Sequence, residues 1–187
     1  MEPDYHIHIS SKSDGLHLNL WEVWRYRDLI WLLTRKTFKL SYKQTVLGPA
    51  WIVINPLLFS LAYMLVFGFI AGISTDGIPQ MLFYLMGTAI WGLFAFSLTS
   101  SSSTFISNAY VFGKVYFPRL TVPISNLLVG LIRFAIQMIL VVILMAVYTA
   151  QGIIHPQWWM FIILPFTLAH LCLMGMGIGI ILSSLTT

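Results

Sequence analysis

Arg133 is the one charged residue that falls inside a long apolar stretch of this chain. It follows Arg119 by about 20 Å of helix at a rise of ~1.5 Å per residue, which predicts a position near the middle of a membrane. An intramembrane arginine costs about 2.5–3.5 kcal/mol on insertion scales and usually faces a cavity or a partner. We therefore expect a ligand at Arg133, a structural pair with Asn55, Gln137 or a helix-end carbonyl, or a side chain that extends to the membrane interface.

The remaining titratable residues form no convincing catalytic or metal-binding set. Asp76 and His155 lie in different links between apolar stretches, so they are weak evidence for an active site. Three histidines near the N-terminus lack a fourth metal ligand, and a solvated tail is the favoured interpretation for His6, His8 and His17. No glycine-rich loop lies between a strand and a helix, so the sequence predicts no nucleotide site of that kind. Because no metal-ligand set is complete either, we expect no cofactor.

The composition points to an integral membrane protein. Hydrophobic residues make up 58% of the 187 residues and charged residues 9%, and the mean hydropathy is +0.86. A soluble domain typically has about 25% charged residues, so this chain could not cover its surface in water. The net charge of +4 is clustered along the chain and is not evidence for nucleic-acid binding. The single cysteine, Cys172, excludes a disulfide framework.

An amphipathic, basic segment precedes the first apolar stretch. We predict a helix over residues 22–40, because Val23, Tyr26 and Ile30 recur at helical spacing on one face. Tryptophan and basic side chains suit the headgroup layer and anionic lipids. The side chains expected to contribute to this interface are Trp24, Arg25, Arg35, Lys36 and Lys39. An ordinary helix packed on protein is the alternative.

Four apolar stretches are long enough to be transmembrane helices. They cover about residues 49–71, 80–100, 120–148 and 158–182, and each has the roughly 20 residues that a ~30 Å hydrocarbon core requires. Asn55-Pro56 predicts a kink inside the first span. The predicted fold class is therefore an all-α membrane protein with an N-terminal amphipathic interface helix and four transmembrane helices.

The basic residues predict the orientation in the membrane. Seven of the ten lysines and arginines precede the first span, and two more lie in the link 108–119. The links 72–79 and 150–157 contain none. The positive-inside rule therefore puts the N-terminus and the link 108–119 in the cytoplasm. We expect residues 1–20 to be a flexible cytoplasmic tail and residues 21–187 to form one transmembrane domain.

Two motifs carry a resemblance to a known family. A basic helix runs into Tyr42–Trp51 (YKQTVLGPAW), and the second link contains Lys114–Arg119 (KVYFPR). This arrangement resembles the permease subunits of ABC-2-type exporters, in particular the polysaccharide and O-antigen branch (Wzm-like), to which capsule and teichoic-acid exporters are related. The resemblance covers about residues 25–187. Because the family has six spans and the last span is followed by no basic residue, we expect a chain truncated after the fourth span.

The resemblance implies a homodimer of permeases that sits on two separate ATPase subunits, so this chain is expected not to be an enzyme. It also implies that the link 108–119 is a coupling loop that docks in a groove of the ATPase. The residues expected to take part are Asn108, Phe112, Lys114, Val115, Tyr116, Phe117 and Arg119. A plain connecting loop is the alternative.

Aromatic side chains are dense in the first two spans, where they could stack on sugar rings or face lipid. The candidate conduit residues are Arg133, Asn55, Trp51 and Tyr63, with Arg133 meeting a pyrophosphate or an anionic sugar. The serines at 97 and 100–103 could hydrate the mouth of a channel or bond to carbonyls one turn earlier. The glycines at 175 and 179 predict a close contact between helices.

The predicted function is that of a permease subunit that moves lipid-linked polysaccharide, such as O-antigen or capsule, from the cytoplasm across the bacterial inner membrane. Its partners would be an ATP-binding ABC subunit, a second permease copy, the lipid-linked glycan and membrane lipids, with no nucleic acid. The alternatives are an ABC-2 permease for a drug, haem or another lipid, a membrane-bound glycan-modifying enzyme, and a truncated fragment that does not transport.

Overall fold

The computed structural model describes residues 20–43, 48–104, 107, 118, 120–155, 157 and 159–185. Every regular element in these ranges is helical. Two helices precede the spans, α1 (Leu20–Arg25) and α2 (Arg27–Lys43), and a turn at Tyr26 separates them. The predicted interface helix is thus interrupted by this turn, and it continues to Lys43.

Within the described residues, four helices are long and apolar enough to cross a membrane. The first span follows the 3-10 turn η1 (Gly48–Ala50) and consists of α3 (Trp51–Tyr63) and the π-helix η2 (Met64–Ile70). The other spans are α4 (Gln80–Ser102), α6 (Thr121–Ala150) and α7 (Met160–Leu185). The prediction of an all-α membrane protein with four spans is confirmed. Pro56, where a kink was predicted, lies inside α3, and the chain becomes π-helical further along the same span.

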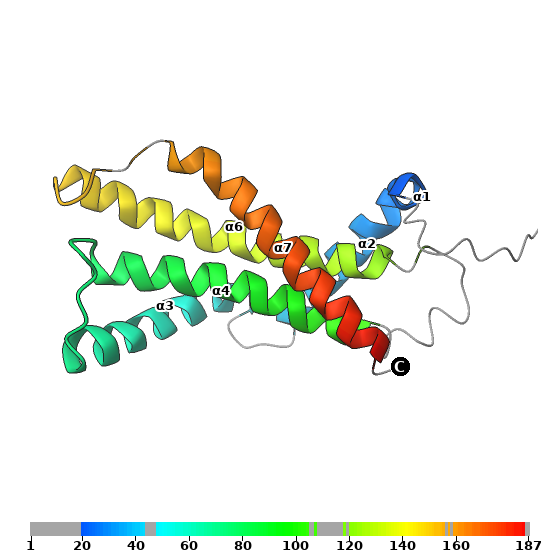
Figure 1. Ribbon diagram of the computed structural model, residues 1–187, viewed down its shortest axis with the longest axis horizontal. Helices are drawn as coiled ribbons and strands as arrows, with labels where there is room; N and C mark the ends of the chain where they lie inside the picture. Colours follow the sequence, from blue (N-terminus) through cyan, green and yellow to red (C-terminus); the bar gives the residue numbers. More distant parts are fainter. Residues whose placement is uncertain are drawn as a thin grey trace, which may run out of the picture.

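The helix α4 is central to the bundle, because it contacts α3, α6 and α7. Figure 1 shows α3 and α6 on opposite sides of α4, with α7 running obliquely across α4. Buried apolar side chains from α4, α6 and α7 form one core cluster, which contains Ala89, Leu93, Phe134 and Cys172. A second cluster joins α4 and α6 closer to the loop that follows α6, and it contains Leu82, Leu85 and Val141.

The helix α2 lies along the first part of α6. The Thr34 hydroxyl is 3.3 Å from the Ser125 carbonyl oxygen, and Ser41 is bonded to Arg133 further along both helices, so α2 and α6 run in the same direction. Ile30, on the apolar face that we predicted from helical spacing, is buried. That face packs on α6 of the same chain. Amphipathic spacing indicates which face of a helix is buried, but it does not indicate whether lipid or protein buries it.

Small residues let α4 and α7 approach closely. A Cβ atom on Gly175 would lie 3.1 Å from the Cβ of Ser97. A Cβ atom on Gly179 would lie 2.6 Å from the Cβ of Ser101 and 2.7 Å from the carbonyl oxygen of Leu98. The close contact predicted from the glycine spacing is confirmed, and its partner is α4 of the same chain.

The serine-rich end of α4 bonds to its own backbone. Ser97 donates to the Leu93 carbonyl at 2.8 Å, and Thr104 donates to the Ser100 carbonyl at 2.8 Å. Ser97 and Ser101 are buried beneath α7. These hydroxyls therefore bond to carbonyls one turn earlier, and Ser97 and Ser101 face no channel in this structure.

We expect Gly179→Ala to destabilise the protein by about 1–3 kcal/mol, because the new methyl group would press on the backbone of α4. Gly177→Ala is the matched control, since a Cβ atom at Gly177 has no neighbour within 4 Å. Thermal unfolding of the detergent-solubilised protein measures both variants. Equal unfolding temperatures for the two variants would contradict the packing of α7 on α4.

Candidate transport site

A pocket of about 320 Å³ opens beside α3 and α4 within the spans. Its lining combines aromatic rings with amide and hydroxyl groups, and it includes Asn55, Phe59, Tyr63, Thr88, Trp91 and Gln137. A second pocket of about 330 Å³ shares Tyr63, Thr88 and Trp91 and adds Phe83 and Tyr84. Because they share lining residues, the two pockets form one continuous surface, which we call the aromatic groove.

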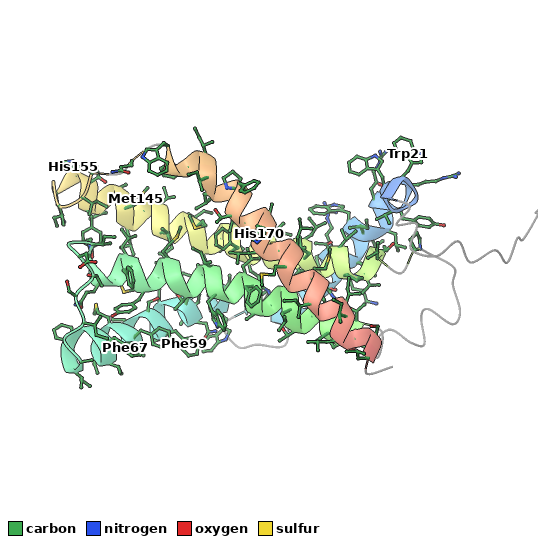
Figure 2. The ribbon with its side chains drawn as sticks, in the orientation of Figure 1. Trp21, Phe59, Phe67, Met145, His155 and His170 are labelled. Atoms are coloured by element: carbon green, nitrogen blue, oxygen red, sulfur yellow. The ribbon has the colours of Figure 1, made fainter. Side chains whose placement is uncertain are left out.

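Tyr63 is the central ring of the aromatic groove. Its centroid lies 6.4 Å from that of Phe59, 5.9 Å from that of Phe67 and 6.4 Å from that of Tyr84. Phe59, Tyr63 and Phe67 recur every four residues, and Figure 2 shows Phe59 and Phe67 along the same edge of the first span. Helical spacing thus brings these rings to one face, where Tyr84 of α4 joins them.

Two amide side chains in the aromatic groove have no hydrogen-bond partner among the described residues. They are Asn55 of α3 and Gln137 of α6, and both line the first pocket. Thr88 differs, because it donates to the Leu85 carbonyl at 3.0 Å and lies 3.3 Å from the Ser60 hydroxyl. A free amide at membrane depth costs free energy unless water, a ligand or a partner meets it. The two amides therefore mark the polar part of the groove.

The aromatic groove is lined by no charged residue among those that the structure describes. It can therefore offer ring faces and neutral hydrogen-bonding groups but no general acid, base or nucleophile of the carboxylate, imidazole or thiol kind. This chemistry suits reversible contact with a neutral polar ligand. No group of three or more potential metal ligands lies close together in the described part of the chain.

Arg133 does not line the aromatic groove, and it contacts α2 and α4. Its Nη2 donates to the Ser41 hydroxyl at 2.9 Å. Its guanidinium carbon is 5.4 Å from the ring centroid of Tyr42 and 4.4 Å from that of Phe96. Burial raises the pKa of the Tyr42 phenol, and the positive charge of Arg133 lowers it by less. The phenol therefore stays neutral at physiological pH, and Arg133 faces its ring rather than a phenolate.

The structure brings together two of the four predicted conduit residues. Asn55 and Tyr63 line the same pocket. Trp51 lies at the start of α3 with 39% of its surface exposed, and it does not line the groove. Whether any of these four residues meets a ligand stays a prediction.

The predicted interface residues of α1 and α2 are exposed. They are Trp24, Arg25, Arg35, Lys36 and Lys39. The guanidinium carbon of Arg35 lies 4.9 Å from the ring centroid of Trp31, so a basic side chain and a tryptophan share this exposed surface. Membrane contact by these residues stays a prediction. The predicted coupling residues Asn108, Phe112, Lys114, Val115, Tyr116, Phe117 and Arg119 lie outside the described residues.

Sequence reasoning did not assign Gln137, Thr88 or His170 to a site. The first two line the aromatic groove, and the spacing of Tyr84, Thr88 and Trp91 on one face of α4 was the available signal. His170 lies within α7 and is exposed, and Figure 2 shows its place part-way along that helix. The sequence signal for His170 is that it is a titratable side chain inside a predicted span.

The family model for the ABC-2 type transporter matches residues 28–187. The chain belongs to the ABC-2 type transporter family. Among its relatives, two O-antigen export system permease proteins RfbA from Klebsiella pneumoniae are 33% and 31% identical over 159 residues, and each match covers 84% of this chain. A protein of the same name from Myxococcus xanthus is 27% identical over 147 residues, or 77% of this chain. No solved structure matches the chain.

This ABC-2 type chain spans 59% of the length of the two Klebsiella relatives and 53% of the length of the Myxococcus relative. The resemblance read from the sequence is confirmed, because the family model and the relatives agree with it. Family membership and the four spans support a multi-pass protein of the inner membrane.

Proposed function

We propose that this ABC-2 type chain is the permease part of an ATP-driven exporter that moves a lipid-linked polysaccharide from the cytoplasm across the bacterial inner membrane. The names of its relatives, which are O-antigen export permeases, support this cargo. The observation that carries the proposal is the aromatic groove, which combines exposed rings with two unpartnered amides inside the spans.

A sugar chain matches the chemistry of the aromatic groove. Sugar rings present flat apolar faces that can lie on Tyr63 and Trp91, and their hydroxyl groups can bond to the amides of Asn55 and Gln137. Because the groove has no lining charge, it would not hold successive sugar units at one fixed position. A polymer could then move along it one unit at a time, which a tight ionic site would prevent.

The groove is open on one side, and two of its rings are largely exposed. Trp91 is 67% exposed and Phe59 is 52% exposed. A second copy of the permease facing this side would enclose the polar groups of the groove away from lipid. We therefore propose that the conduit forms between two copies, with each copy contributing its own Tyr63, Asn55 and Gln137.

Energy would come from a separate ABC ATPase subunit, as family membership implies. We propose that the link 108–119 docks on that subunit and that α2 with its basic surface lies on the same, cytoplasmic, side. In this mechanism ATP binding closes the ATPase subunits, the docked link and α2 move with them, and the spans separate around the groove. Repeated cycles of ATP binding and hydrolysis would move the glycan onward.

Co-purification tests the proposed assembly. The tagged chain is expressed with a candidate ABC ATPase from the same organism, extracted in mild detergent and passed over an affinity column and a sizing column. We expect the ATPase to remain bound in equal amounts, and alanine at both Tyr116 and Phe117 to release it. An ATPase that never associates with the intact chain would contradict the proposed partnership.

A further inference from the structure

Arg133 occupies the junction of three helices and does not line the aromatic groove. It belongs to α6, it bonds to α2 through Ser41, and it faces Phe96 of α4. Figure 1 shows that α2 ends, and the first span begins, part-way along α4 and α6. The helix α6 continues for about 25 Å beyond Arg133, close to the thickness of a ~30 Å hydrocarbon core. These observations put Arg133 at the level where the chain passes from α2 into the membrane.

The contact with α2 is geometrically specific. The Ser41 hydroxyl accepts a hydrogen bond from Arg133 at 2.9 Å and donates one to the Thr37 carbonyl at 2.9 Å, so both its roles are defined. Tyr42 adds its ring face to the guanidinium and packs edge-on against Phe38 at 5.3 Å. Arg133 is therefore attached to the last turn of α2, directly before the connection to the first span.

The contact with α4 depends on a glycine. A Cβ atom at Gly130 would lie 2.9 Å from the Cδ1 atom of Phe96. The absence of a side chain at Gly130 lets the Phe96 ring approach α6, one turn before Arg133, and places it 4.4 Å from the guanidinium carbon. No carboxylate in the described part of the chain pairs with Arg133. The cation is thus held by two aromatic faces and one hydroxyl, an arrangement that cation–π attraction stabilises.

We propose that Arg133 is a positioning residue that fixes the last turn of α2 to α4 and α6, so that movement of α2 is transmitted to the spans. Four residues carry the attachment: Arg133, Ser41, Tyr42 and Phe96. The transmission rests on the proposed exporter function, whereas the attachment does not. The Thr34 contact with Ser125 already holds the middle of α2 on α6. Arg133 adds an attachment at the last turn of α2, next to the first span, and extends it to Phe96 of α4.

Hydrogen exchange of the full chain in lipid nanodiscs tests the attachment. Arg133→Met keeps the length and apolar stem of the side chain but removes its charge and donors, whereas Arg133→Lys keeps the charge. We expect the amides of residues 38–43 to exchange about tenfold faster in Arg133→Met, the scale of losing one charge-assisted hydrogen bond and one cation–π contact, and to change less in Arg133→Lys. Arg25→Gln, which removes an exposed cation from α1, is the matched control and should leave this exchange unchanged.

The amount of glycan exported per ATP hydrolysed tests the transmission in the complex with the ATPase. We expect Arg133→Met to lower this ratio severalfold and Arg133→Lys to restore most of it. The attachment would be overturned if the exchange of residues 38–43 were unchanged in Arg133→Met. It would also be overturned if exchange protection fell equally in Arg133→Met and Arg133→Lys. Faster exchange at an unchanged ratio would overturn the transmission. If the unmodified complex exports no glycan, the proposed function fails, and the exchange measurement still decides the attachment.

Discussion

Replacing Trp91 by alanine is expected to lower ATP-dependent glycan export about fivefold without unfolding the protein. Trp91 lines both pockets of the aromatic groove and is 67% exposed, so its ring contributes little to the packed core. Loss of one stacking face is worth about 1 kcal/mol, and ~1.4 kcal/mol corresponds to a factor of ten. The measurement is the initial rate of glycan appearance across reconstituted vesicles, with circular dichroism as the check on folding.

Two control variants show whether an effect of Trp91→Ala comes from the loss of a ring face in the aromatic groove. Trp91→Phe keeps a ring face and should retain most of the export rate. Phe166→Ala removes an aromatic side chain of α7 that is 77% exposed and lies outside the groove, so it should have no effect on export. If Trp91→Ala exports at the unmodified rate, or if Phe166→Ala is equally slow, the groove is not the path of the glycan.

Alanine at Tyr116 and Phe117 together is expected to have the largest effect, a loss of nearly all export-coupled ATP hydrolysis. Both residues lie in the KVYFPR motif, through which the chain resembles exporter permeases that dock on an ATPase. Buried aromatic anchors at interfaces are each worth about 2 kcal/mol or more, or roughly thirtyfold in affinity. The ATPase activity of the reconstituted complex, measured with and without glycan, reports the loss.

Lys114→Gln is the matched control for the coupling loop. A charge at the rim of an interface contributes less than a buried ring, so we expect at most a severalfold change, and association of the variant should depend less on salt. The hydrogen-exchange protection of α4 and α6 should be the same in the unmodified chain, the double alanine variant and Lys114→Gln. Equal protection would show that the spans remain folded. Full ATPase stimulation in the double alanine variant would show that the link 108–119 is a plain connection.

The four spans could be predicted from the sequence because their signal is local. Each predicted range overlaps a helix of the structure, and length and apolarity alone decide that a segment can cross a bilayer. The close contact at Gly175 and Gly179 was predictable for the same reason, because only a small residue permits it. What spacing could not reveal is that α4 of the same chain, at Ser97 and Ser101, is the partner.

The partners of Arg133 and of α2 could not be predicted, because they depend on how the helices pack. Counting residues from Arg119 predicted a depth near the middle of the membrane, whereas the bond to Ser41 puts Arg133 beside the last turn of α2, before the first span. The count also gave none of the neighbours that its long side chain reaches. The apolar stripe of α2 was recognised, yet Ile30 is buried against protein rather than lipid. In the aromatic groove, Tyr63 and Asn55 were predicted from residue type, whereas Gln137 joins them only through the packing of α6.

ATP-dependent export by the purified complex tests the central claim most directly. The chain and its ATPase are reconstituted in vesicles with the ATP site outside, and a lipid-linked polysaccharide is supplied in the outer leaflet. We predict that ATP moves the glycan to the lumen, where it becomes protected from an added glycosidase, and that a hydrolysis-deficient ATPase abolishes this protection. Glycan that stays fully accessible with ATP, or becomes protected equally without it, would contradict the account.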